Sequence, residues 1–317
     1  MKVLVTGANG FVGRSLVKRL LESGTTEVIF HTRAQNEPIP DGCKHFAAIV
    51  GPETDWTTAL RGVDAVFHLA ARAHKLADRR SGAEATAVYR SVNTDGTLRL
   101  ATQAAECGVR RFIFLSSIGV NGSETFDHPF TADDKPDPQT PYALSKLEAE
   151  RGLMSLAQQS VMEVVIVRAP LVYGAFAPGN LGSLLNAVRH HRLLPLGAIR
   201  QNRRSLVSVE NLVDLLTTGC LRHVAAKNQV FLVCDDQDLS TTELVVTMAH
   251  AVGVKARLLP IPLWMLRIAT GLVGKPHVYK QLVGNLQVDM AKTRELLNWT
   301  PPKTVVEGFQ LVGNNLR

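Results

Sequence analysis

The chain has 317 residues, of which 45% are hydrophobic, and its 35 lysine and arginine residues against 28 aspartate and glutamate residues give a net charge of +7. This length allows one large domain with a smaller one appended to it. The basic residues are scattered except at residues 200–204, whereas a nucleic-acid-binding protein would concentrate them, so we expect no nucleic-acid partner and interpret the charge as suited to an anionic small molecule.

The first elements predicted are a strand, a turn and a helix. Residues 3–5 are a short β-branched run that ends in glycines, and apolar residues recur at helical spacing over residues 11–23. The turn has G-x-x-G-x-x-G spacing, which permits a tight bend and lets a pyrophosphate approach the free N–H groups of the helix N-terminus. The residues expected to bind a dinucleotide here are Gly7, Asn9, Gly10, Phe11, Val12, Gly13 and Arg14.

The second strand, predicted at residues 28–30, bears on the choice of dinucleotide. An NAD site usually places an acidic residue about 20 residues after the glycines, where it bonds the adenosine ribose. Here the strand ends in His31, Thr32 and Arg33. Arg33, together with Arg14, suits the 2′-phosphate of NADP, although Arg33 as a solvated charge at a strand end is the alternative. The sequence favours NADP, with NAD as the second choice.

Apolar strands then alternate with helices along the chain. We predict strands at residues 65–67, 111–115 and 164–167, and helices at residues 58–60, 85–106 and 142–159. This alternation is typical of a parallel sheet covered on both faces. The predicted fold class is α/β, a Rossmann doubly wound parallel sheet with helices on both faces and a smaller C-terminal α/β substrate lobe. We place the dinucleotide-binding domain at residues 1–174, with a return to it at about residues 205–235, and the substrate lobe mainly at residues 175–317.

A candidate catalytic group follows the strand at residues 111–115. Ser117 comes at the end of that strand, and after a long polar loop the chain reads Tyr142-Ala-Leu-Ser-Lys146. Helix positions four apart share a face, so Lys146 can favour the phenolate of Tyr142, whose pKa is otherwise ~10. Ser117 could hold a substrate oxygen by a hydrogen bond. A Y-x-x-x-K string alone also fits an exposed amphipathic turn.

The most apolar segment, residues 259–273, is interrupted by Arg267, Gly271 and two prolines. It is too short and too broken to span a bilayer, so we expect no stable membrane insertion. The favoured interpretation is an amphipathic helix packed on the smaller lobe. Lys275, His277 and Lys280 keep association with a membrane surface as the weaker alternative.

The four cysteines are far apart and form no C-x-x-C pair, so the sequence predicts neither a disulfide framework nor a metal site. The chain begins directly with a strand, without the charged start and apolar stretch of a signal peptide. Both features lead us to expect a cytoplasmic protein.

Taken in order, the motifs resemble the extended short-chain dehydrogenase/reductase family, and within it the nucleotide-sugar epimerases, dehydratases and 4-ketosugar reductases. The matching segments span nearly the whole chain and lie at residues 6–13, 62–71, 93–97, 114–117, 142–146, 168–174, 204–212 and 298–302. The ordered set is specific to the family and much less specific to one reaction.

The resemblance implies catalytic roles for Ser117, Tyr142 and Lys146. It also implies that the cofactor is lined by Tyr142, Lys146, Leu69, Ala70 and Ala71. Relatives often dimerise through two long helices, so we expect a homodimer.

The substrate implied by the resemblance is a UDP- or dTDP-sugar. Asn180 and Arg204 match the positions that hold its diphosphate, and Asn121 falls where many relatives carry a tyrosine beside the sugar. Asn93 would support the active site from a helix. Pro52 stands where relatives have an aspartate, which weakens the expected adenine contact.

Two reactions remain open. A 4-ketoreductase delivers hydride once from NADPH, whereas a 4-epimerase oxidises and re-reduces C4 with a retained NAD. Arg33 favours the first, NADPH-dependent reduction of a UDP-4-keto-6-deoxy-N-acetylhexosamine for O-antigen (lipopolysaccharide) or capsule sugars. The alternative is a 4-epimerase of UDP-glucose or a UDP-N-acetylhexosamine.

Two further functions are disfavoured. A dehydratase normally has an Asp-Glu pair after the catalytic serine or threonine, whereas Ile118 and Gly119 follow Ser117 here. A non-catalytic dinucleotide sensor on the same fold would have no reason to keep Ser117, Tyr142 and Lys146 together.

Overall fold

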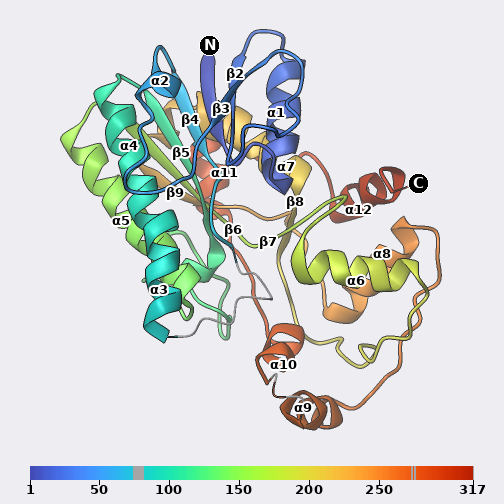
Figure 1. Ribbon diagram of the computed structural model, residues 1–317. Helices are drawn as coiled ribbons and strands as arrows, with labels where there is room; N and C mark the ends of the chain where they lie inside the picture. Colours follow the sequence, from blue (N-terminus) through green and yellow to red (C-terminus); the bar gives the residue numbers. More distant parts are fainter. Residues whose placement is uncertain (74–81, 273, 275, 317) are drawn as a thin grey trace.

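The computed structural model describes residues 1–73, 82–272, 274 and 276–316 (Figure 1). In this part of the chain the central sheet has the strand order β3-β2-β1-β4-β5-β6-β9, and all neighbouring strands are parallel. The strands are β1 (Lys2–Thr6), β2 (Glu27–Thr32), β3 (Cys43–Ala47), β4 (Ala65–His68), β5 (Arg111–Ser117), β6 (Glu163–Ala169) and β9 (Gln229–Leu232). The chain builds outward from β1 in both directions, so the predicted doubly wound Rossmann fold is confirmed.

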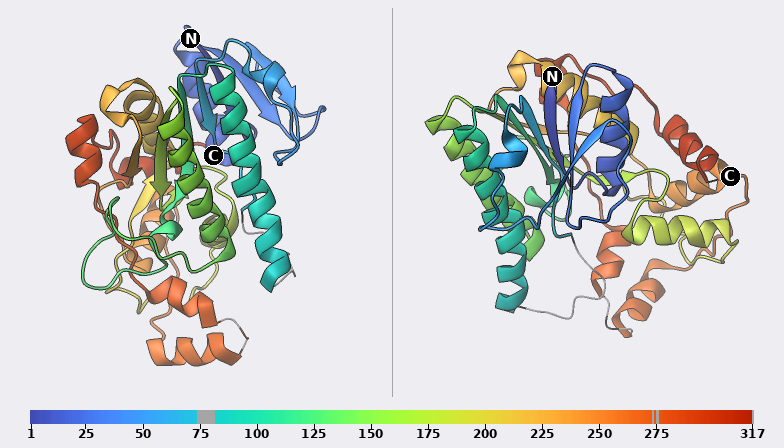
Figure 2. Two further views of the ribbon diagram at one scale, coloured as in Figure 1. Left: turned by 90° about the vertical axis from the view of Figure 1, so that its left-hand side faces the viewer. Right: turned by 45° about the horizontal axis from the view of Figure 1, so that its top comes forward.

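Helices cover both faces of this sheet (Figures 1 and 2). Alternate residues of β1 face opposite ways: Val3 and Val5 belong to one buried cluster and Leu4 to the other. The first cluster is closed by α1 (Phe11–Glu22), α7 (Val209–Asp214) and α11 (Ala291–Leu297). The second is closed by α2 (Thr57–Leu60), α4 (Gly96–Glu106) and α5 (Pro141–Gln159). Burial on both faces explains why most strands are continuous apolar runs.

The helix expected at residues 85–106 is one continuous helical stretch in three parts. It begins as α3 (Gly82–Arg90), passes through a π-helical turn, η1 (Ser91–Asp95), and continues as α4. A π-helical turn inside a long helix frequently marks a functional site. Here it carries Asn93.

Two strands of the sheet were missing from the sequence prediction. β3 is a short edge strand whose residues are exposed or half-buried, so it lacks the apolar run that identifies its neighbours. β9 pairs with β6 at the other edge and comes from the second half of the chain. Between them in sequence, β7 (Leu171–Tyr173) and β8 (Leu206–Ser208) form a separate parallel pair.

The remaining helices build a lobe beside the carboxyl ends of the strands (Figure 1). They are α6 (Gly179–Arg189), α8 (Thr241–Ala251), α9 (Leu263–Leu272), α10 (Pro276–Val283) and α12 (Val305–Asn314). Tyr173 joins this lobe to the sheet domain: its ring stacks on Phe309 at 4.1 Å between centroids, and its hydroxyl donates to Asp235 at 2.6 Å.

The amphipathic helix expected within residues 259–273 is α9, which packs on the lobe along one side. Leu266 is the one buried residue in α9, and Leu263 is partly buried against the lobe core. The segment is shorter and less covered than its hydrophobicity suggested, because much of its apolar surface faces away from the core. In the part of the chain that the structure describes, no helix is long and apolar enough to cross a membrane.

Candidate active site

The glycine turn between β1 and α1 has the geometry of an anion site. Gly7 has φ +66°, and a Cβ placed there would lie 2.9 Å from Cα of Ala70. At Gly13 a Cβ would lie 2.2 Å from the carbonyl oxygen of Gly7, so the helix can approach the strand only without side chains. α1 starts with no side-chain cap and no acidic residue in its first turn, which leaves its N-terminus suited to the pyrophosphate of a dinucleotide.

A cleft of about 1280 Å³ opens beside this turn. Most of the predicted cofactor residues line it: Gly7, Asn9, Gly10, Phe11, Arg14, Arg33, Leu69, Ala70 and Ala71. Four other predicted cofactor residues do not: Val12, Gly13, Tyr142 and Lys146. Gly13 is buried where helix meets strand, whereas Tyr142 and Lys146 lie on α5.

Sequence reasoning missed several residues of the cleft. His31 is buried, accepts a hydrogen bond from the Gly7 N–H at 3.4 Å and contacts the Ala48 carbonyl through Nε2 at 2.9 Å. Burial lowers the pKa of His31 to about 4, so it stays neutral and fixes the glycine turn against the end of β3. Phe176, in a loop of the second half of the chain, also lines the cleft with φ +63°.

The segment that follows β3 contributes apolar residues to the cleft. Ile49 and Val50 line it. Pro52, which stands where relatives have an aspartate, does not line it. The sequence analysis did not predict β3, so it could not place the residues that follow this strand relative to the cleft. Ile49 is 72% exposed, an unusual value for isoleucine that a bound adenine ring would reduce.

Cationic side chains gather at the mouth of the cleft. Arg14, Lys18 and Arg33 are exposed and line it, and Arg19 forms an ion pair with Asp214 at 3.6 Å. A dinucleotide carries at least two negative charges, so these side chains complement it. Arg33 lies where the sequence analysis placed it, directly after β2.

Ser117 and Tyr142 come from neighbouring elements. Ser117 ends β5, and its Oγ accepts from the Gly119 N–H at 3.1 Å, which leaves its own hydroxyl proton available to a substrate. Tyr142 lies in the first turn of α5, which is capped by Thr140 through a hydrogen bond from the Ala143 N–H. The Tyr142 ring meets Tyr89 edge-on at 6.1 Å between centroids.

The environment shifts the pKa values of Tyr142 and Lys146 toward their neutral forms. Burial raises the pKa of Tyr142 to about 12, and Tyr89 adds to the rise. Burial lowers the pKa of Lys146 to about 7, although Glu150 opposes the shift. The structure therefore does not show the expected lowering of the Tyr142 pKa by Lys146, because burial and Tyr89 both raise that pKa. A lowered value would need further positive charge beside the phenol.

Asn93 connects the cofactor cleft to the catalytic helix. Its Oδ1 accepts from the Arg72 N–H at 2.8 Å, and its Nδ2 donates to Ser145 Oγ at 3.0 Å. Arg72 lines the cleft, and Ser145 lies between Tyr142 and Lys146. The Asn93 side chain on the π-helical turn thus links the backbone of the cleft to α5.

Asn121 is turned into the protein. It is 2% exposed, accepts from Arg168 at 3.0 Å and donates to the Thr131 carbonyl at 2.8 Å. Arg168 is paired in turn with buried Glu150. Asn121 therefore holds the loop after Ser117, and its expected contact with a sugar stays a prediction.

The two residues expected at a diphosphate lie in the second half of the chain, outside the cofactor cleft. Asn180 is exposed in the first turn of α6. Arg204 is half-buried and donates to the Gly284 carbonyl at 3.0 Å. The structure gives no contact between them, so their shared role stays a prediction.

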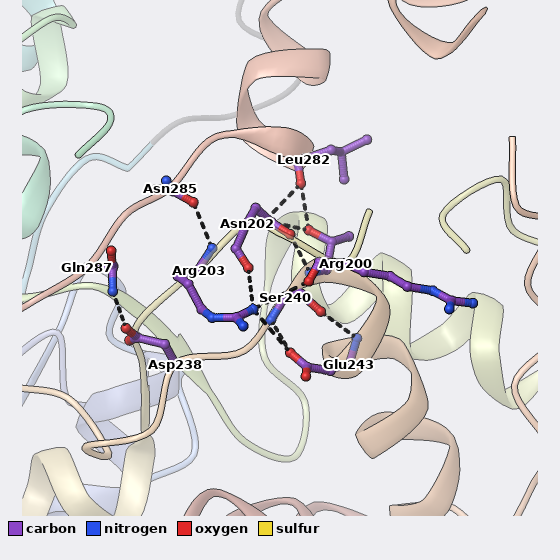
Figure 3. Close-up of polar contacts among 10 residues, drawn as sticks. Arg200, Asn202, Arg203, Asp238, Ser240, Glu243, Leu282, Asn285 and Gln287 are labelled. Carbon is purple, nitrogen blue, oxygen red and sulfur yellow. Dashed lines mark hydrogen bonds and ion pairs between the residues drawn. The ribbon is translucent and has the colours of Figure 1, made fainter. Parts of the chain in front are cut away.

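Polar contacts anchor the loop that leads to Arg204 (Figure 3). Asn202 accepts from the Thr241 N–H at 3.0 Å and donates to the Leu282 carbonyl at 3.2 Å. The backbone N–H of Arg203 donates to Asn285 at 2.8 Å. These bonds tie the loop to the start of α8 and the end of α10, so Arg204 is presented from a fixed backbone.

The chain is similar to known proteins over nearly its whole length. Residues 3–234 match the model of the NAD dependent epimerase/dehydratase family. The chain is 45% identical over 310 residues to the UDP-glucose 4-epimerase of Vibrio cholerae, which covers 97% of this chain and 93% of that protein. It is 28% identical to the N-acetyl-alpha-D-glucosaminyl-diphospho-ditrans,octacis-undecaprenol 4-epimerase of Escherichia coli O157:H7, covering 97% and 92%.

Solved structures show the same fold. A UDP-glucose 4-epimerase from Thermotoga maritima, solved with UDP-glucose, has a TM-score of 0.81 at 22% identity and covers 100% of this chain and 99% of its own. A UDP-glucuronic acid 4-epimerase from Bacillus cereus, solved with NAD, has a TM-score of 0.78 at 19% identity and covers 99% and 96%.

Proposed function

Because the chain belongs to the NAD dependent epimerase/dehydratase family, we propose that it is a UDP-sugar 4-epimerase that keeps NAD bound throughout its reaction. The observation that carries the proposal is the 45% identity to a UDP-glucose 4-epimerase over nearly the full length of both chains. This reverses the preference of the sequence analysis, which placed a 4-ketoreductase first.

The cleft fits the proposed cofactor. The uncapped start of α1 suits a pyrophosphate, the side-chain-free approach of Gly7 to Ala70 leaves room for it, and Ile49 and Val50 offer an apolar wall. When bound, the nicotinamide supplies a reversible hydride acceptor for C4 of the sugar. Tyr142 and Ser117 would act on the oxygen of that carbon.

Tyr142 is the proposed acid-base group. As the phenolate it would take the proton of the C4 hydroxyl, and as the resulting phenol it would return that proton to the C4 oxygen in the reverse step. The positive charge of the oxidised nicotinamide and of Lys146 would lower its pKa from about 12. Ser117, whose Oγ accepts a hydrogen bond from the Gly119 N–H, would donate a hydrogen bond to the same oxygen.

Arg204 and Asn180 are proposed to hold the UDP diphosphate from the second half of the chain. A guanidinium presented by a fixed loop is suited to a diphosphate. We further propose a cytoplasmic homodimer that acts in O-antigen sugar synthesis, which rests on family resemblance.

The second candidate is the 4-ketoreductase, because Arg33 lines the cleft where an NAD-specific site usually has an acidic residue. The two candidates differ in how they use the cofactor. An epimerase recycles a tightly bound NAD, whereas a reductase consumes NADPH and releases NADP.

The experiment is to purify the protein, identify the nucleotide released on denaturation, and incubate the native enzyme with UDP-glucose and UDP-N-acetylglucosamine without added cofactor. The proposal expects bound NAD or NADH and conversion to the galacto epimers, which Tyr142→Phe abolishes. The opposite result is no conversion of either sugar, together with oxidation of added NADPH in the presence of a UDP-4-keto-6-deoxy-N-acetylhexosamine.

A further inference from the structure

The outward face of α9 is apolar and exposed. Trp264, Ile268 and Leu272 recur at four-residue spacing and share one side of the helix, with Met265 beside them. Their exposed fractions are 64%, 54%, 84% and 45%. Leu266 is buried on the opposite side. A helix that is apolar on both sides normally needs a cover on each.

α9 lies at the end of the molecule opposite the N-terminus (Figures 1 and 2). α9 and α10 stand out there beyond the rest of the lobe. None of the residues that line the cofactor cleft comes from either helix. α9 therefore lies outside the cleft, at a projecting end of the molecule that can meet an extended surface.

The charged residues in the sequence around α9 are all basic. Between Leu244 and Val288 there is no aspartate or glutamate, whereas the chain's average would put about four in such a stretch. The same stretch holds five basic residues: Lys255, Arg257, Arg267, Lys275 and Lys280. All of them except Lys275, which lies outside the described residues, are exposed. Arg267 on α9 and Lys280 on α10 thus add cationic side chains to the two helices themselves.

We propose that α9 and its basic neighbours dock the protein on the surface of an anionic lipid bilayer. Leu272, Ile268 and Trp264 would enter the boundary between acyl chains and headgroups, with α9 lying in the plane of the surface. Tryptophan is the residue type that favours this depth, and exposed lysine and arginine are attracted by lipid phosphates. α9 does not span the bilayer.

The charge around α9 favours an anionic bilayer over a second copy of the chain as the surface that covers this helix. A two-fold pairing through α9 would bring Arg267 and Lys280 of both copies together without an acidic residue of this stretch to neutralise them. An anionic membrane supplies that neutralisation. The inference does not depend on the proposed function, since α9 contributes nothing to the cleft.

The intrinsic fluorescence of Trp264 can report contact with a membrane surface. Trp56 and Trp299 are 0% and 6% exposed, so a change in tryptophan emission on contact with a surface comes from Trp264. We would add vesicles of phosphatidylcholine alone, or of phosphatidylcholine and phosphatidylglycerol in equal parts, and follow both emission and sedimentation. The expected result is a blue shift and co-sedimentation with the anionic vesicles only.

Three variants test the two components. The double change Ile268→Ser and Leu272→Ser should abolish co-sedimentation, and Arg267→Gln with Lys280→Gln should weaken binding by at least ~5-fold, the usual effect of one basic residue near an anionic surface. Val161→Ser removes a valine that is 91% exposed between α5 and β6, and should bind as the wild type does. All three should keep the wild-type activity in solution, which shows that they are folded.

Two outcomes would overturn the proposal. One is equal binding of wild-type protein and the serine double variant, or no binding of either, to the anionic vesicles. The other is a blue shift that appears without vesicles as protein concentration rises, together with a larger sedimenting species, because that would assign the face to a second copy of the chain.

Discussion

The ammonium of Lys146 donates a hydrogen bond to the carbonyl oxygen of Leu115 at 2.8 Å, two residues before Ser117. The same ammonium lies 4.2 Å from the centre of the Phe114 ring. These contacts fix α5, which carries Tyr142, against the carboxyl end of β5, the strand that Ser117 ends. They also keep a cation in the interior, where burial lowers its pKa to about 7.

The first prediction concerns the pH dependence of stability that Lys146 creates. Its pKa is 10.5 in the unfolded chain and about 7 in the folded protein, so between these values the unfolded state binds more protons and stability rises with pH. Below pH 7 the charged lysine costs on the order of 5 kcal/mol, and above pH 10.5 this cost is gone. Relative to Lys146→Met, wild-type protein should gain unfolding free energy from pH 7 to 10.

Urea unfolding of the cofactor-free protein at several pH values measures this difference. Lys227→Met, which replaces an exposed lysine, should keep the wild-type pH dependence. A constant difference between wild-type protein and Lys146→Met across the whole window would mean that Lys146 is not buried in its charged form at neutral pH.

The second prediction is that Tyr142→Phe loses at least ~100-fold in turnover, the usual scale for removal of an acid-base group. The phenyl ring should keep its edge-on contact with Tyr89, so folding and cofactor content should not change. Tyr279→Phe makes the same chemical change on α10 and should retain activity. Near-normal turnover of Tyr142→Phe would remove Tyr142 from the mechanism.

The third prediction is that Arg33 governs the preference between dinucleotides. Arg33→Asp should weaken NADP binding more than NAD binding, because an acidic residue beside the ribose repels a 2′-phosphate and can accept from a 2′-hydroxyl. Titration of both nucleotides gives the ratio of dissociation constants. Arg61→Asp changes an exposed arginine outside the cleft and is the control. An unchanged ratio would show that Arg33 is only a solvated charge.

The fourth prediction is that Arg204 holds the diphosphate of the sugar nucleotide. Arg204→Ala should raise the KM for the UDP-sugar with little effect on cofactor binding, since a charged hydrogen bond contributes roughly 1.5–3 kcal/mol. Arg203→Ala is the matched control, because Arg203 is the exposed neighbour whose guanidinium lies 3.9 Å from Glu243 (Figure 3).

Calorimetric titration of UDP separates binding from structural support. If Arg204 only fixes the Gly284 backbone, Arg204→Ala will lose thermal stability while its affinity for UDP equals that of Arg203→Ala. That result would show that Arg204 does not bind the diphosphate of the sugar nucleotide.

Some parts of the site could be read from the sequence because they depend on local backbone geometry. The spacing of Gly7, Gly10 and Gly13 between an apolar strand and a helix specifies the turn, since a side chain at Gly7 or Gly13 would collide with backbone atoms. The i to i+4 spacing of Tyr142 and Lys146 likewise places both on one side of α5. Arg33 follows directly from the end of an apolar strand.

Contacts between distant segments decided the rest. The sequence could not show that Ile49 and Val50, which follow β3, would line the cleft, or that Asn121 would turn inward to Arg168. Nor could it show that burial would raise the pKa of Tyr142 to about 12. Each depends on which surfaces come together, and desolvation has no signature in local sequence. The hydrophobicity of residues 259–273 was likewise evident from the sequence alone. Only the tertiary structure shows that Trp264, Ile268 and Leu272 are left outside the core, because burial is decided by the neighbours a helix finds and not by its own composition.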